Sequence, residues 1–100
     1  MKPVDVAFSA EATRDMIDLG IYLSGVAGQA VAEGYIARLQ AYCLGFGVAP
    51  MRGMRRDDVR KGLRIIGFER RVTLLFSVSQ RQVLFLRILY GGQDWQRQFR

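Results

Sequence analysis

The chain has 100 residues, half of them hydrophobic and only two of them proline, so we expect one folded domain over residues 1–100 rather than disorder. Fifteen Lys and Arg against nine Asp and Glu give a net charge of +6, which favours an acidic partner: nucleic acid, an acidic protein or an anionic membrane. The absence of histidine removes the usual base at neutral pH, and a single cysteine excludes an internal disulfide and a Cys-based zinc site. We therefore expect no metal and no cofactor.

Charge and hydropathy are unevenly distributed along the chain. Residues 1–50 contain three basic and five acidic side chains, a net −2, whereas residues 51–100 contain twelve basic and four acidic ones, a net +8. The surface for an acidic partner is therefore expected in the second half. No apolar segment has the length of a signal peptide or of a transmembrane helix. We expect a reduced, cytoplasmic protein that makes no membrane contact.

The first half predicts a strand followed by two helices. Alternation over residues 4–8 is typical of a short strand, and Ser9 follows as a helix N-cap. Apolar residues at helical spacing predict one helix that ends by Gly28 and a second from about residue 29 to 46. Because the connection is very short, these helices must form an antiparallel hairpin. Cys43 lies on the packed face of the second helix and is predicted to be a core residue.

The second half predicts a basic loop followed by three strands. Residues 51–62 show no sustained period and are rich in arginine, which indicates a loop with at most one helical turn. Runs of β-type residues over 63–68, 72–78 and 83–90, joined by short turns, predict an antiparallel meander. We therefore expect an α+β fold: an N-terminal strand and an α-helical hairpin packed on a small, mainly antiparallel sheet completed by the meander.

Four short motifs occur in order along the chain. They are Tyr22-Leu23, Pro-Met-Arg-Gly at residues 50–53, Arg-Asp-Asp-Val-Arg-Lys-Gly-Leu-Arg at 56–64 and Arg-Ile-Leu-Tyr-Gly-Gly-Gln-Asp at 87–94. In this order and at these spacings they resemble the ParE branch of the RelE/ParE toxin superfamily. The resemblance implies the toxin of a bacterial type II toxin–antitoxin pair. Such a toxin inhibits DNA gyrase by binding, without catalysis, and a ParD-like antitoxin neutralises it. The resemblance further implies that the toxin contacts DNA only indirectly, through gyrase or the antitoxin.

Two alternatives stay open. Gln93 stands where the family commonly has arginine, and this loss of a charge keeps a decayed toxin that retains only antitoxin binding among the candidates. In the RNA-cleaving RelE branch, basic residues and a C-terminal tyrosine position the substrate. Arg64, Arg87 and Tyr90 match that pattern, so a ribosome-dependent mRNA endoribonuclease is the second alternative.

Arg87 is the most informative single residue because its strand neighbours are apolar on both sides. A charge inside a covered sheet must be paired or must serve a site. The candidate partners are Asp94, Asp58 and Asp57. If Arg64 shares a sheet face with Arg87, their guanidinium groups would together form an anion-binding pocket.

The remaining candidates fall into two groups. For target contact we select Arg64, Arg87, Tyr90, Arg56, Arg60 and Trp95; for antitoxin contact we select Ile17, Ile21, Arg52 and Arg55. The arginine-rich segment either faces water or meets an acidic antitoxin tail or a gyrase–DNA complex. The two isoleucines form a second apolar stripe on the first helix, which either meets the antitoxin or packs within the molecule. The rings of Trp95 and Phe99 either cover the end of the sheet or present a contact.

Overall fold

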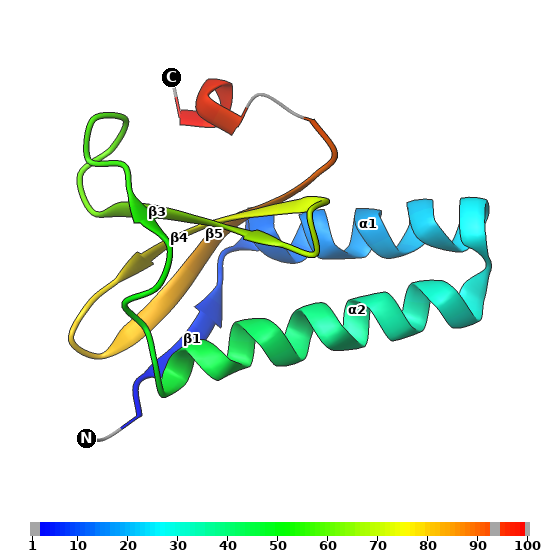
Figure 1. Cartoon of the computed structure of the whole chain (residues 1–100), viewed down its shortest axis with the longest axis horizontal. Coiled ribbons are helices and arrows are strands. Elements are labelled where there is room, and N and C mark those ends of the chain that lie inside the picture. The colour runs from blue at the N-terminus through cyan, green and yellow to red at the C-terminus, as the bar shows by residue number, and fades with distance from the viewer. Residues whose placement is uncertain (1–2, 93–94, 100) are drawn as a thin grey trace.

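Two helices pack against a five-stranded sheet in the computed structural model, which describes residues 3–92 and 95–99 (Figure 1). In chain order the elements are β1 (Asp5–Phe8), α1 (Ala10–Ala27), α2 (Gln29–Leu44), the 3₁₀ helix η1 (Gly45–Gly47), β2 (Met54–Arg55), β3 (Leu63–Phe68), β4 (Val72–Val78), β5 (Gln82–Tyr90) and the 3₁₀ helix η2 (Trp95–Phe99). The strand order is β1-β5-β4-β3-β2; β1 and β5 are parallel and the other pairs antiparallel. The predicted α+β class and mainly antiparallel sheet are confirmed.

The helical hairpin depends on the residues at the two ends of α1, an N-cap at its start and a glycine at its end. The Ser9 hydroxyl accepts a hydrogen bond from the backbone N–H of Ala12 (2.9 Å), as expected of an N-cap. Gly28 has a φ of 93°, a value that side chains disfavour, and it reverses the chain between α1 and α2. α2 ends at Leu44, two residues earlier than predicted, because the chain tightens into η1. Within residues 3–92 and 95–99, no helix has the length and apolarity that crossing a membrane requires.

The main core lies between the helices and the sheet. Phe46, Phe76 and Phe85 are fully buried, with ring centroids 5.1–5.6 Å apart. These edge-to-face and tilted contacts add to the apolar area that the rings bury. Cys43 is also fully buried, and burial raises the pKa of its thiol to about 12. Its prediction as a core residue is confirmed.

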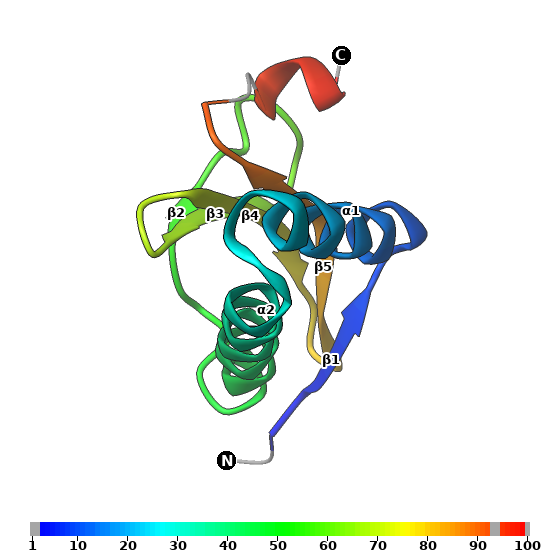
Figure 2. The same cartoon turned by 90° about the vertical axis from the view of Figure 1, so that its right-hand side faces the viewer.

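A smaller apolar cluster lies on the opposite face of the sheet. Leu63, Leu75 and Leu89 are buried there, and Trp95 of η2 packs against them. Figure 2 shows η2 on the side of the sheet away from α2. The Trp95 ring therefore covers the sheet; the side chain of Phe99 lies outside what the structure describes.

The segment predicted as a basic loop contains an edge strand, β2, which is a correction. Met54 pairs with Ile65 of β3, and Arg55 pairs with Arg64. Gly53 permits this close approach: it has a φ of 74°, and a Cβ there would lie 2.2 Å from the carbonyl oxygen of Ile65. A strand of two residues is too short to produce a periodic pattern, so the sequence does not reveal it.

Candidate functional site

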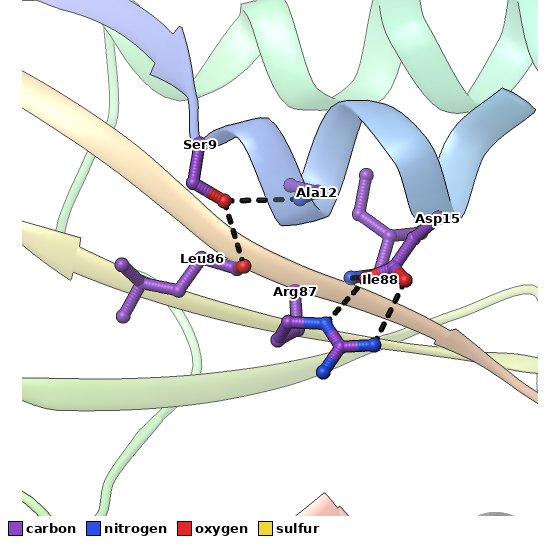
Figure 3. A network of polar contacts seen from close by, with 6 residues as sticks. All are labelled: Ser9, Ala12, Asp15, Leu86, Arg87 and Ile88. Atoms are coloured by element: carbon purple, nitrogen blue, oxygen red, sulfur yellow. Dashed lines mark hydrogen bonds and ion pairs between the residues drawn. The ribbon is translucent and has the colours of Figure 1, made fainter. Parts of the chain in front are cut away.

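The start of α1 bonds to the edge of β5 where β1 ends. β1 pairs only with the first four residues of β5, so later backbone groups on that edge need other partners. The N–H of Ser9 donates to the carbonyl of Phe85 (2.9 Å), and its hydroxyl donates to the carbonyl of Leu86 (2.8 Å). Further along α1, the carboxylate of Asp15 accepts the N–H of Ile88 (2.9 Å). α1 therefore continues the edge bonding that β1 begins (Figure 3).

The same carboxylate holds the side chain of Arg87. Asp15 accepts hydrogen bonds from Nε of Arg87 (2.7 Å) and from its Nη2 (2.9 Å), a two-point contact that favours one orientation. The two side chains are 13% and 23% exposed, respectively. The hydrogen bonds that Arg87 donates to Asp15 raise the pKa of Arg87, although burial acts in the opposite direction. Arg87 is thus oriented by α1 and remains a cation.

Asp15 is a partner of Arg87 that the sequence did not indicate, and it corrects the expectation of Asp57 or Asp58. Asp57 and Asp58 each bond to the arginine two positions earlier, while Asp15 bonds to Arg87. Asp94, like Gln93 and Arg100, lies outside the described residues. Asp15 is 72 positions from Arg87, and no local pattern in the sequence indicates which turn of α1 meets β5.

A polar groove of about 450 Å³ lies beside this ion pair. Its lining includes Asp18, Tyr22, Arg87 and Tyr90. The rings of Tyr22 and Tyr90 have centroids 5.6 Å apart, so Tyr90 contacts an aromatic residue of α1. The groove brings together Arg87 and Tyr90, two of the residues selected for target contact, and adds Tyr22 from one of the sequence motifs.

Arg64 lies on the opposite face of the sheet from Arg87. In the strand register, Arg64 is opposite Phe76 and Arg87 is opposite Leu75, and directly opposite residues share a face. Phe76 belongs to the core under the helices, whereas Leu75 belongs to the cluster on the other face. The anion pocket considered for Arg64 and Arg87 is therefore not formed, and Tyr90 does not meet both arginines in one site.

Arg56 and Trp95 meet on the outer face of the sheet. The guanidinium carbon of Arg56 lies 4.9 Å from the centre of the Trp95 ring, a cation–π contact. Nε and Nη2 of Arg56 also donate to the carboxylate of Asp58 at 2.9 Å each. This pairing raises the pKa of Arg56 and lowers that of Asp58. Arg60 is exposed in the adjacent turn, where its N–H donates to the carbonyl of Arg56 (3.3 Å).

Arg52 is folded against the end of α2. Its Nε donates to the carbonyl of Ala49 (2.7 Å) and its Nη2 to the carbonyl of Gly45 (3.1 Å). Its guanidinium carbon lies 4.6 Å from the centre of the Phe46 ring. Arg52 thus anchors the loop that follows α2, and its selection for antitoxin contact stays a prediction.

Arg55 is exposed on the edge strand. Its Nε donates to Asp57 (2.9 Å), and the Asp57 carboxylate also accepts the N–H of Gly62 (2.8 Å). Both hydrogen bonds lower the pKa of Asp57, and the one from the N–H of Gly62 has the larger effect. Asp57 therefore closes the loop between β2 and β3, while the role of Arg55 toward an antitoxin stays a prediction.

An apolar groove runs between α1 and α2. It consists of two adjoining cavities of about 410 and 540 Å³, which share Ile17, Gly20, Ile36 and Gln40. Ile17 is 53% exposed and Ile21, which lines the larger cavity, is 67% exposed. The second apolar stripe predicted on α1 is confirmed as surface, and packing within the molecule does not cover it. Gly20 lines both cavities without a side chain to fill them.

Comparison with known proteins gives one family and one fold. A family profile described as ParE toxin of type II toxin–antitoxin system, parDE, matches residues 6–95. The chromosomal ParDE toxin–antitoxin system from P. aeruginosa superposes with a TM-score of 0.76 at 17% identity, covering 88% of this chain and 96% of that one. The RelBE2 toxin–antitoxin complex from Mycobacterium tuberculosis gives 0.64 at 20% identity, covering 93% and 97%. A sequence search of curated proteins finds no match.

Proposed function

The chain belongs to the ParE toxin family of type II toxin–antitoxin systems, and from this we propose that it inhibits DNA gyrase by binding and is neutralised by a ParD-like antitoxin. The toxin acts in the cytoplasm and without catalysis of its own. DNA damage then follows from the chemistry of the blocked gyrase. The toxin meets DNA only through gyrase or through the antitoxin.

The observation that supports neutralisation by an antitoxin is the apolar groove between α1 and α2. Ile17 and Ile21 lie on adjacent turns of α1 and are more than half exposed. Burying one such side chain on a partner contributes about 1.5–3 kcal/mol. A segment with apolar side chains at helical spacing fits a groove between two helices. Docking of the antitoxin there covers surface that the toxin leaves open to water.

The proposed binding of gyrase rests on residues in the basic half of the chain. Arg87 and Tyr90 line one groove, and Arg56 stacks on Trp95 across the outer face of the sheet. Each of these arginines is oriented by a carboxylate, so each presents a fixed shape rather than a mobile charge. Together with Arg60, these residues supply the surface that meets gyrase. The opposite placement of Arg64 and Arg87 argues against the RelE-like ribonuclease alternative.

The experiment is induction of the chain without its antitoxin, which we expect a short neighbouring reading frame to encode, with a DNA-binding domain. We expect a DNA damage response, loss of supercoiling by purified gyrase and intact messenger RNA. Co-expression of the antitoxin is the control and restores growth. Ribosome-dependent RNA cleavage with normal gyrase activity would establish the ribonuclease instead. Normal gyrase and intact RNA, with tight antitoxin binding retained, would establish a decayed toxin.

A further inference from the structure

We propose that Arg64 anchors a carboxylate-binding pocket at the β2 edge of the sheet, and that an extended acidic segment of the antitoxin places an Asp or Glu side chain in it. The pocket has a volume of about 190 Å³ and is lined by Met51, Arg55, Gly62, Arg64 and Val78. None of these residues lines the groove between α1 and α2, so the two are separate surfaces. The inference rests on the proposed function, which supplies the antitoxin.

Arg64 is held in position as a carboxylate receptor. Its Nε donates to the carbonyl of Arg52 (3.0 Å), and Arg52 is itself anchored to α2. The terminal nitrogens Nη1 and Nη2 of Arg64 have no hydrogen-bonding partner among residues 3–92 and 95–99. A half-buried guanidinium fixed through Nε presents these two nitrogens as a fork, which matches the two oxygens of a carboxylate.

A second arginine raises the positive charge of the pocket. Arg55 lies directly opposite Arg64 in the pairing of β2 with β3. Like charges directly opposite each other destabilise an antiparallel pair. Arg55 donates a hydrogen bond to Asp57. Arg64 acts on Asp57 only through a longer-range electrostatic attraction. A carboxylate bound at the Nη groups of Arg64 would therefore relieve a repulsion that the isolated toxin retains.

The geometry of β2 favours an extended occupant. β2 is the last strand of the sheet, so its outer edge has no neighbouring strand in the described part of the chain. The N–H of Arg56 donates inward to Leu63 (2.8 Å), and the alternation of an antiparallel pair then directs the backbone groups of Arg55 outward. An extended segment can pair with these groups while one of its side chains enters the pocket.

The apolar walls favour a protein over a nucleic acid. Met51 and Val78 line the pocket, and the Met51 side chain is 69% exposed. These side chains suit the methylene groups of Asp or Glu and the apolar neighbours of an extended peptide. A hydrated phosphodiester backbone gains little from such walls.

The test compares the affinity of the full-length antitoxin for three toxin variants by isothermal titration calorimetry. We expect R64Q to weaken binding about tenfold or more, because the fork is lost. R64K retains the charge without the fork and should not restore full affinity. R81Q removes the same charge from the exposed β4–β5 turn and should bind like the wild type. Equal affinities for R64Q and the wild type would refute the pocket.

A second measurement leaves the toxin unaltered. Each Asp or Glu in the tail of the antitoxin is changed to its amide, and one of these changes should weaken binding to the wild-type toxin but not to R64Q. If none does, the pocket is refuted. R64Q that keeps its antitoxin affinity but loses binding of a short single-stranded RNA would indicate a phosphate site instead. If the wild-type toxin inhibits gyrase and binds the antitoxin with the same affinity as R64Q, the pocket alone is refuted. If the wild-type toxin does not bind the antitoxin at all, both proposals are refuted.

Discussion

The carboxylate of Asp15 bonds to both the side chain of Arg87 and the backbone N–H of the next residue, and in this way joins the first helix to the last strand. Both side chains are mostly buried. In such a pair, loss of one partner costs more than the pair contributes, because the remaining charge stays desolvated. The pair therefore fixes how α1 lies against β5, and it orients the arginine that lines the polar groove.

Replacement of Asp15 by alanine should lower the free energy of unfolding by about 2–3 kcal/mol, because Arg87 and the N–H of Ile88 both lose an acceptor. Urea denaturation measures the change. D18A, at an exposed acid of the same helix, is the control and should alter stability by less than about 0.5 kcal/mol. D15A and R87A together should cost less than the sum of the single changes. Equal effects of D15A and D18A would show that the ion pair contributes nothing.

Introduction of a carboxylate at Ile21 should weaken antitoxin binding and leave the toxin folded. The side chain is 67% exposed, so I21E should change the free energy of unfolding by less than about 0.5 kcal/mol. In the complex, the bound antitoxin would remove the new carboxylate from water, and the affinity for the antitoxin should fall about tenfold or more. V26E is the matched control, since Val26 is 64% exposed on the same helix but lines neither cavity of the groove. Similar losses for both variants in calorimetric titration would contradict the docking site.

The turn between β3 and β4 should be stabilised by glycine. Glu69 and Arg70 have φ angles of 48° and 63°; they are the central residues of the β-turn closed by the hydrogen bond from the N–H of Arg71 to the carbonyl of Phe68 (3.2 Å). Non-glycine residues adopt this conformation at a cost of about 1–2 kcal/mol each. R70G should therefore raise the free energy of unfolding by about 0.5–1 kcal/mol, while Glu69 keeps its ion pair with Arg38. R70A removes the same charge and should give no gain; if it stabilises equally, charge and not backbone strain is the cause.

Two glycine-to-alanine changes should have opposite effects. At Gly53 the added Cβ would lie 2.2 Å from a backbone oxygen of β3, and the φ of 74° disfavours any side chain. G53A should destabilise by more than about 2 kcal/mol and displace β2. Gly25 lies within α1 with no atom within 4 Å of such a Cβ, so G25A should stabilise by about 0.5–1 kcal/mol. Thermal denaturation separates the two, and a tolerated G53A would show that β2 does not need the close approach.

Cys43 should react with a disulfide reagent only when the protein unfolds. Burial raises the pKa of its thiol to about 12, above the ordinary value, so the reactive thiolate is almost absent in the folded protein at pH 8. The fully buried side chain is also inaccessible. The rate of labelling should therefore rise with urea in parallel with unfolding. Labelling of the native protein at the rate of a free thiol would contradict this environment.

The periodic parts of the fold are predictable from sequence because their pattern is local. The bounds of β3 and β4 match the predicted runs residue for residue, and α1 ends before Gly28 as expected. Each of these elements has an apolar face that repeats with the period of its backbone. β2 escapes prediction because its place at the edge depends on the approach of Gly53 to β3 rather than on a repeat.

The arrangement of the arginines is not predictable because it depends on a single irregularity. The pairing of β4 with β5 shifts between Leu75 and Phe76, where β5 carries one additional residue. Alternation counted from Phe85 would place Arg87 on the helix side of the sheet, the same face as Arg64. The bulge moves it to the other face. One extra residue thus separates the two arginines, and no sequence pattern marks it.

The pairing of the first strand with the last has a consequence for synthesis of the toxin. β1 and the Asp15 carboxylate both bond to residues 82–88, so an emerging chain that stops short of β5 offers them no partner. Contacts between such distant residues form late and slow folding. The ribosome must therefore complete most of the polypeptide before a native toxin can exist.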